Sequence, residues 1–147
     1  MNTGPTHDLS ATRSGGSVIV VDDEPHVLAV ACAMLQSQGF QVVPCASGEE
    51  ALEILQQSIQ AGMDHQAMVL DLTLPGGMSG FEVMDSLATL APDLPVIASS
   101  GYFQEDARDL CQAIGFADIL QKPYPVEHLC ATVRRCIARE RSPVLSK

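Results

Sequence analysis

The sequence of 147 residues lacks an apolar run that approaches the roughly 18 residues needed to cross a membrane. Residues 1–16 lack the basic start and apolar centre of a signal peptide, and are instead small and polar. We therefore expect a cytoplasmic protein that does not bind membranes, with residues 1–16 and 142–147 as disordered tails.

Metal-binding cysteine pairs and basic patches are also missing. The five cysteines form no CxxC pair and have no histidine at metal-ligand spacing, so reduced, mostly buried thiols are expected. A formal net charge of −10 argues against binding nucleic acid, which requires a basic surface for phosphate contacts. The one basic cluster is more simply the solvated face and last turn of a helix: Arg134, Arg135, Arg139 and Arg141.

Short apolar runs alternate with stretches of helical periodicity from residue 17 onward, within a length typical of one domain. The runs are rich in valine, isoleucine and leucine, as parallel strands covered by helices on both sides require. They predict strands at 17–21, 41–45, 67–72, 95–99 and 119–121. The expected fold class is α/β, a doubly wound (βα)5 unit with a five-stranded parallel sheet over residues 17–141.

Cap and turn residues indicate where the helices begin and end. Pro25 suits the first turn of the first helix, and Ser47 with Glu50 has the spacing of a capping box before the second. Gly39 and Gly115 stand where a helix ends in a left-handed residue. The later helices are expected at 81–90, 105–114 and 126–141.

Polar side chains that can take part in catalysis or metal binding lie at the carboxyl ends of the predicted strands, where open α/β sheets place their ligand sites. Asp22 and Asp23 follow the first strand, Asp71 lies in the third, Ser100 follows the fourth and Lys122 follows the fifth. A carboxylate inside an apolar strand is costly unless it is paired. These carboxylates, with a lysine, suit a magnesium-assisted attack on a phosphoryl group.

Each of these residues also has a purely structural interpretation. The acids after the first strand suit a helix N-terminus, Ser100 suits a turn before Gly101, and Lys122 suits a solvated loop. Because all of them stand at strand ends of one sheet, the functional interpretation is the stronger one.

Four segments, VVDDEP, VLDLTLPGGMSG, IASSGY and LQKPY, resemble the signature segments of response regulator receiver domains, in the family's order. The resemblance covers about residues 17–140 and implies a flavodoxin-like strand order 2-1-3-4-5. It implies Asp71 as the phosphoryl acceptor, with Mg²⁺, or Mn²⁺ in its place, held by Asp22, Asp23, Asp71 and the backbone carbonyl of Thr73.

The resemblance also implies roles for residues around the acceptor. Ser100 would be the switch hydroxyl and Lys122 the partner of the acceptor and the phosphoryl group, with a cis bond before Pro123. Thr73 and Tyr102 would tune dephosphorylation.

Two departures from the family pattern concern how the signal leaves the site. Ile119 stands where the family commonly has an aromatic residue that moves with the switch hydroxyl, which puts that relay in doubt. The loop 75–80 carries one residue more than the common form, as in receivers attached to hybrid histidine kinases.

The implied function is phosphorelay signal transduction in a two-component system. A sensor histidine kinase or a histidine phosphotransfer domain would donate the phosphoryl group in a magnesium-dependent reaction, docking near Val27, Val30 and Ala31. The domain would catalyse only its own phosphorylation and dephosphorylation, as a monomer or weak homodimer, and would signal to an output partner that the sequence does not identify.

Two other classes of protein share parts of this pattern. A haloacid dehalogenase-type phosphohydrolase also uses a strand-end aspartate, but it needs a second acid where this sequence has Thr73. A receiver-shaped interaction module that no longer takes phosphate remains open, although every residue of the acceptor site is present.

Overall fold

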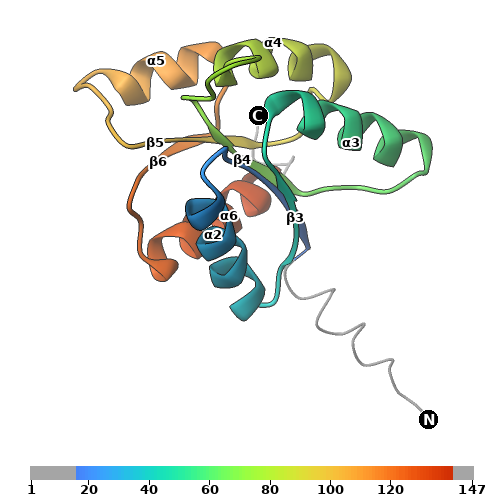
Figure 1. Cartoon of the computed structure of the whole chain (residues 1–147), viewed down its shortest axis with the longest axis horizontal. Coiled ribbons are helices and arrows are strands. Elements are labelled where there is room, and N and C mark those ends of the chain that lie inside the picture. The colour runs from blue at the N-terminus through green and yellow to red at the C-terminus, as the bar shows by residue number, and fades with distance from the viewer. Residues whose placement is uncertain (1–15, 141–147) are drawn as a thin grey trace.

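The computed structural model describes residues 16–140, so nearly all of both predicted tails, and the predicted end of the last helix at residue 141, lie outside the described residues. Five strands alternate with five helices (Figure 1). The strands are β2 (Ser17–Val21), β3 (Gln41–Cys45), β4 (Ala67–Asp71), β5 (Val96–Ser100) and β6 (Asp118–Gln121). The helices are α2 (Pro25–Ser37), α3 (Gly48–Gln60), α4 (Gly80–Leu90), α5 (Ala107–Ile114) and α6 (Val126–Glu140).

The five strands form one parallel sheet in the order β3-β2-β4-β5-β6. This is the order 2-1-3-4-5 in chain sequence, so the predicted fold class and strand order are confirmed. Strand order reverses between β2 and β4, and the carboxyl ends of those two neighbours carry Asp22 and Asp71. A doubly wound sheet places its ligand site at such a point.

Helices cover both faces of the sheet, α2 and α6 on one side and α3, α4 and α5 on the other (Figure 1). Alternate residues of each strand therefore enter two separate cores. Val18 and Val20 of β2 pack with α2 and α6, whereas Ile19 and Val21 pack with the three helices opposite. All five cysteines are free, and four of them are buried. Among the described residues, no helix combines the length and apolar character that a membrane crossing requires.

The helix caps match the prediction in part. Pro25 opens α2, and Gly39 and Gly115 have φ of +94° and +120°, as expected for residues that end helices. The Ser47 hydroxyl accepts the Glu50 N–H, but the Glu50 carboxylate accepts the N–H of Ala46 instead of Ser47, so this capping box is only half formed.

The reciprocal capping box is instead formed at α4. The Ser79 hydroxyl accepts the Glu82 N–H, and the Glu82 carboxylate accepts the Ser79 N–H. The same Ser-x-x-Glu spacing was present in the sequence and was overlooked there. α5 begins at Ala107, two residues later than predicted, and the N-cap side chain of Asp106 forms no capping bond.

The start of α3 packs directly on α4 through a glycine. A Cβ placed on Gly48 would lie 2.3 Å from Cγ2 of Val83, a stiff and fully buried side chain. We expect Gly48→Ala to destabilise the fold by about 1–3 kcal/mol through overpacking. Urea unfolding measures this change.

Gly101→Ala is the matched control, because a Cβ at Gly101 meets no atom within 4 Å and its backbone conformation is not left-handed. It should leave stability nearly unchanged. Equal stability of the Gly48 variant and the parent would show that α3 and α4 are not in contact at this point.

Candidate phosphoryl-acceptor site

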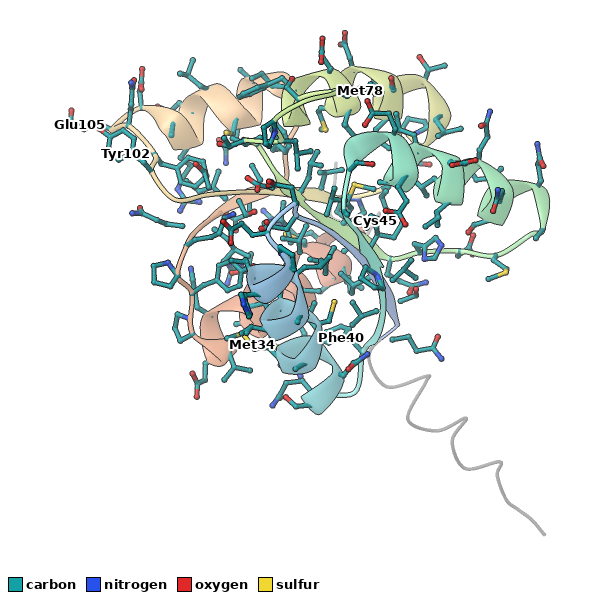
Figure 2. The ribbon with its side chains drawn as sticks, in the orientation of Figure 1. Met34, Phe40, Cys45, Met78, Tyr102 and Glu105 are labelled. Atoms are coloured by element: carbon teal, nitrogen blue, oxygen red, sulfur yellow. The ribbon has the colours of Figure 1, made fainter. Side chains whose placement is uncertain are left out.

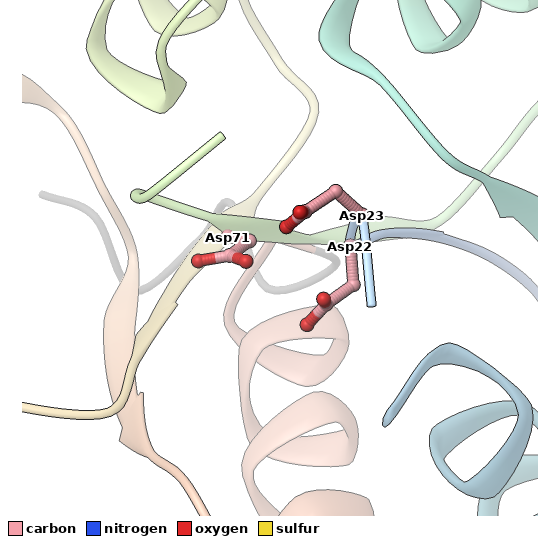
Figure 3. A group of neighbouring side chains, drawn as sticks. All are labelled: Asp22, Asp23 and Asp71. Atoms are coloured by element: carbon pink, nitrogen blue, oxygen red, sulfur yellow. The ribbon is translucent and has the colours of Figure 1, made fainter. Parts of the chain in front are cut away.

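Three carboxylates meet at the carboxyl edge of the sheet. Asp22 directly follows β2, Asp23 comes next, and Asp71 is the last residue of the neighbouring strand β4. One oxygen of each lies within 4.8 Å of the others (Figure 3). Asp22 and Asp71 are each only 2% exposed, whereas Asp23 is open to solvent. The structure thus brings together the predicted acidic cluster.

Lys122 lies across this cluster, just after the end of β6. Its Nζ donates to Oδ2 of Asp22 at 2.9 Å and to Oδ2 of Asp71 at 3.2 Å. The bond between Lys122 and Pro123 is cis, as expected from the resemblance. The resemblance implied that Lys122 pairs with the acceptor and the phosphoryl group, and the contact to Asp22 is a finding of the structure.

The electrostatics of the site show that one ammonium serves two buried carboxylates. Burial raises the pKa of Asp71 above its ordinary value, and the charge of Asp22 raises it further. The Thr73 N–H and Lys122 oppose this shift without reversing it. Burial alone would lower the pKa of Lys122, but its hydrogen bond to Asp22 and the charges of both carboxylates raise it. The site therefore holds an excess of negative charge.

A divalent cation fits this donor set. Mg²⁺ prefers oxygen ligands and usually takes one or two protein carboxylates, keeping its other positions for water and phosphate oxygens. Asp23 and Asp71 offer such oxygens, and the excess charge of the cluster favours a cation. The Thr73 carbonyl was expected to be a further metal ligand. The Thr73 N–H donates to Oδ1 of Asp71 at 2.9 Å, which holds this residue next to the cluster.

Ser100 ends β5 and is buried, but its hydrogen bonds do not lead to the carboxylates. Its hydroxyl donates to the carbonyl oxygen of Tyr102 at 3.0 Å and accepts the Tyr102 N–H at 3.2 Å. The Tyr102 side chain itself is 72% exposed. The candidate switch hydroxyl is therefore engaged with the backbone of the loop that leads to α5.

Ile119 lies on β6, partly buried against the core formed with α3, α4 and α5. The structure thus has an aliphatic side chain where an aromatic relay would stand.

An apolar groove of about 410 Å³ adjoins the site between α2 and the segment after β6. Val27, Val30 and Ala31, the strip predicted from the sequence, form one wall. The opposite wall was not predicted, because residues far along the chain form it: Lys122, Pro123 and Tyr124. Tyr124 is buried, and burial, followed by the charge of Asp22, raises the pKa of its hydroxyl to about 12.

A contact that the sequence did not reveal fixes the loop after the acceptor. A carboxylate oxygen of Glu49, in the first turn of α3, accepts the N–H of Met78 at 2.9 Å. This loop contains the additional residue noted in the sequence. Glu49 was not singled out, since its partner lies 29 residues away.

With this geometry established, the chain can be compared with known proteins. The family model described as "Response regulator receiver domain" matches residues 18–134. The chain therefore belongs to the response regulator receiver domain family. This is a family of signalling domains, and the dehalogenase-type class is thereby set aside.

Two curated relatives are longer proteins, of which the chain matches a part. The chain is 32% identical over 134 residues to the transcriptional regulatory protein CreB of Escherichia coli, covering 88% of this chain and 56% of CreB. It is 34% identical over 134 residues to the sensor kinase CckA of Brucella abortus, covering 90% of this chain and 13% of CckA. The chain thus spans about half the length of the regulators it matches.

Solved structures share the fold. A CheY-like receiver domain protein from Methanospirillum hungatei aligns with a TM-score of 0.76 at 20% identity, covering 88% of this chain and 99% of that one. NtrX from Brucella abortus aligns with a TM-score of 0.79 at 21% identity, covering 88% of this chain and 28% of that one.

The raised pKa of Asp71 predicts that its charge destabilises the metal-free fold. The cost is fully present above the folded-state pKa and disappears below the ordinary value of 3.8, where both states are protonated. In EDTA at pH 7, Asp71→Asn should unfold at a higher temperature than the parent, and the difference should narrow as the pH approaches 3.8. Thermal scans across this pH range measure the effect.

Asp93→Asn, which removes an exposed carboxylate outside the cluster, is the control and should show no such pH-dependent gain. An Asp71→Asn protein that is less stable than the parent at pH 7 would contradict the proposed charge excess.

Proposed function

We propose that this receiver domain accepts a phosphoryl group on Asp71 from a histidine kinase or a histidine phosphotransfer domain, in a reaction that depends on Mg²⁺. The observation that carries the proposal is the ammonium of Lys122 between two buried carboxylates, with a third carboxylate beside them. The same residues support a role in phosphorelay signal transduction through a conformational change.

The chemistry assigns a task to each side chain. An Oδ atom of Asp71 attacks phosphorus, the bond from phosphorus to the donor's imidazole nitrogen breaks, and the imidazole leaves with the electron pair. Lys122, already 3.2 Å from Oδ2 of Asp71, neutralises charge on the transferred phosphoryl oxygens. Bound Mg²⁺, held by Asp22, Asp23, Asp71 and the Thr73 carbonyl, would supply further charge neutralisation. Hydrolysis of the acyl phosphate, with Thr73 and Tyr102 near the attacking water, returns the domain to its starting state.

Ser100 is the candidate switch in this scheme. Its hydroxyl is held by Tyr102 in the structure, and a phosphoryl oxygen on Asp71 offers a stronger, charged acceptor. Turning toward that acceptor breaks both contacts with the loop before α5.

The donor is expected to dock on the groove between α2 and residues 122–124. This groove is mainly apolar, and Val30 on its rim is 51% exposed. Because Lys122 forms part of the groove wall, a donor seated there lies next to the acceptor. Docking of this kind places phosphorus in line without requiring the domain to rearrange.

Phosphorylation by a small-molecule donor tests the proposal. Acetyl phosphate with Mg²⁺ should add one phosphoryl group per chain, seen by intact-mass analysis, because Asp71 is buried beside Lys122 and stands at the acceptor position that the receiver family implies. Asp71→Asn should abolish the addition, and Asp93→Asn should not. Undiminished labelling of Asp71→Asn, or labelling in EDTA, would refute the assignment.

Magnesium should also stabilise the fold, since it binds the assembled cluster and hardly the unfolded chain. At ten times its dissociation constant, linkage adds about 1.4 kcal/mol, which raises the unfolding midpoint by roughly 4 °C for a domain of this size. Asp23→Asn should lose most of this gain in thermal scans with magnesium against EDTA, and Mn²⁺ should act in the same way.

Thr73→Ala is the matched control, because the proposed ligand from this residue is its backbone carbonyl and its side chain is exposed. The Thr73→Ala protein should keep the full rise in unfolding midpoint that magnesium causes. If Asp23→Asn gains as much as the parent, the metal does not bind at this cluster.

A further inference from the structure

The helices α3 and α4 and the loop before α5 come from a part of the chain without formal positive charge. Between Arg13 and Arg108 the sequence contains no lysine or arginine, whereas thirteen of its 18 acidic residues lie there. Arg108 itself reaches toward β6, where its Nη1 donates to Oδ1 of Asp118 at 2.6 Å. On the described surface around α4 and the start of α5, the exposed carboxylates therefore outnumber the one exposed cation, Arg108; they are Glu82, Asp85, Glu105, Asp106 and Asp109.

Large apolar side chains stand exposed within this acidic surface. Phe81 of α4 is 45% exposed, and Leu110 and Ile114 of α5 are 54% and 47% exposed. Leu110 and Ile114 are four residues apart and share one face of their helix. The Phe81 ring packs edge-on against Phe116, just after α5, with ring centroids 6.3 Å apart, and α4 and α5 lie along the same side of the sheet (Figure 1). We name Phe81, Leu110 and Ile114 the α4–α5 ridge.

Carboxylates stand next to the ridge on both helices. Asp85 follows Phe81 by one turn of α4, and Asp106 precedes Leu110 by one turn of α5. Asp109 is the neighbour of Leu110, and all three carboxylates are exposed. An apolar strip bordered by carboxylates complements a helix that has an apolar row and lysine or arginine at its sides.

The first of two physical links joins the acceptor to α4. A Cβ on Gly80, the first residue of α4, would lie 2.7 Å from the backbone oxygen of Asp71. Phe81 is the next residue, so the ridge begins one position from a point of direct contact with the acceptor. Such close packing transmits a backbone shift at Asp71 to α4 instead of absorbing it.

The second link joins the switch hydroxyl to α5. Both hydrogen bonds of the Ser100 hydroxyl go to the backbone of Tyr102, and Figure 2 shows Tyr102 and Glu105 in the loop at the outer end of α5. When the hydroxyl turns to a phosphoryl group, this loop loses its two hydrogen bonds to the Ser100 side chain. Both links lead to the two helices that carry the ridge, and neither requires an aromatic residue at Ile119.

We propose that the α4–α5 ridge is the output surface of this domain, and that it binds a basic amphipathic helix of a partner protein with an affinity that depends on the phosphoryl group on Asp71. This inference rests on the proposed function and extends it to the chemical class of the output partner.

The test uses the full chain and a fluorescent, designed helical peptide of about 18 residues, or five turns, with a leucine row flanked by lysines. Fluorescence anisotropy measures its affinity for the free domain and for the domain with Mg²⁺ and beryllofluoride, which imitates the phosphoryl group. We expect the two affinities to differ by about fivefold or more, within the usual range of coupling between sites. A peptide of equal charge with serine for leucine should bind at least about tenfold more weakly, since it has no apolar surface to bury.

Two substitutions locate the binding surface, each with a matched control on α3. Leu110→Gln and Asp85→Lys should each weaken peptide binding by about tenfold, through lost apolar burial and reversed charge. Ile59→Gln, 49% exposed, and Glu53→Lys, also exposed, should change the affinity by less than about twofold, because both residues lie on α3 and outside the ridge. All four changed positions are solvent-exposed, so the fold should be kept.

The outcomes separate this inference from the proposed function. Intact-mass analysis with acetyl phosphate is run on every variant, and absence of labelling on Asp71 would defeat the proposed function itself. Normal labelling of Asp71, together with a peptide affinity that is unchanged by beryllofluoride, by Leu110→Gln or by Asp85→Lys, would overturn the proposed output surface and leave the proposed function intact. If the serine peptide binds as tightly as the leucine peptide, binding depends on net charge alone and the ridge is not a specific site. If the domain forms a concentration-dependent dimer that Leu110→Gln abolishes, the ridge binds a second copy of this chain and not a partner helix.

Discussion

The structure depends on placing two carboxylates, each almost fully buried, at adjacent strand ends with one ammonium between them. Asp22 and Asp71 repel one another, and Lys122 binds both at 2.9 and 3.2 Å. An isolated buried charge would be far more costly than this arrangement. Because two buried carboxylates share one ammonium, the site keeps an excess of negative charge and is suited to a divalent cation and, with the cation bound, to the transfer of an anionic group.

The backbone packs closely around Asp71, the proposed acceptor. Gly80 allows α4 to begin against the carbonyl of Asp71, and Gly48 allows α3 to contact Val83 of α4. The carboxylate of Glu49 holds the intervening loop at Met78. β4, the loop after it, α3 and α4 are therefore joined by a continuous series of contacts. This series offers a route from Asp71 to α4 that does not need an aromatic side chain at the position of Ile119.

The two binding surfaces that we propose lie on opposite faces of the sheet. The apolar groove proposed for the donor lies on the side of α2 and α6, while the proposed α4–α5 ridge lies across the sheet. Described lysines and arginines are confined to α5 and the segment after it, where Asp118 pairs with Arg108 and Arg135. Because the two proposed surfaces lie on opposite faces of the sheet, a donor and an output partner need not compete.

The sequence by itself determined the α/β class, the approximate strand positions and the residues at the strand ends, because hydrophobic periodicity is a local pattern that a parallel sheet imposes on each segment, whereas the strand order followed from the family resemblance. It also placed Asp22, Asp23, Asp71 and Lys122 at one edge, since parallel strands end together. Only the tertiary structure decided that Lys122 binds Asp22 as well, that the Ser100 hydroxyl bonds to the Tyr102 backbone, and that α4 and α5 expose large apolar side chains. These depend on side-chain rotamers and helix packing, which are set by neighbours up to 100 residues away and not by the local pattern.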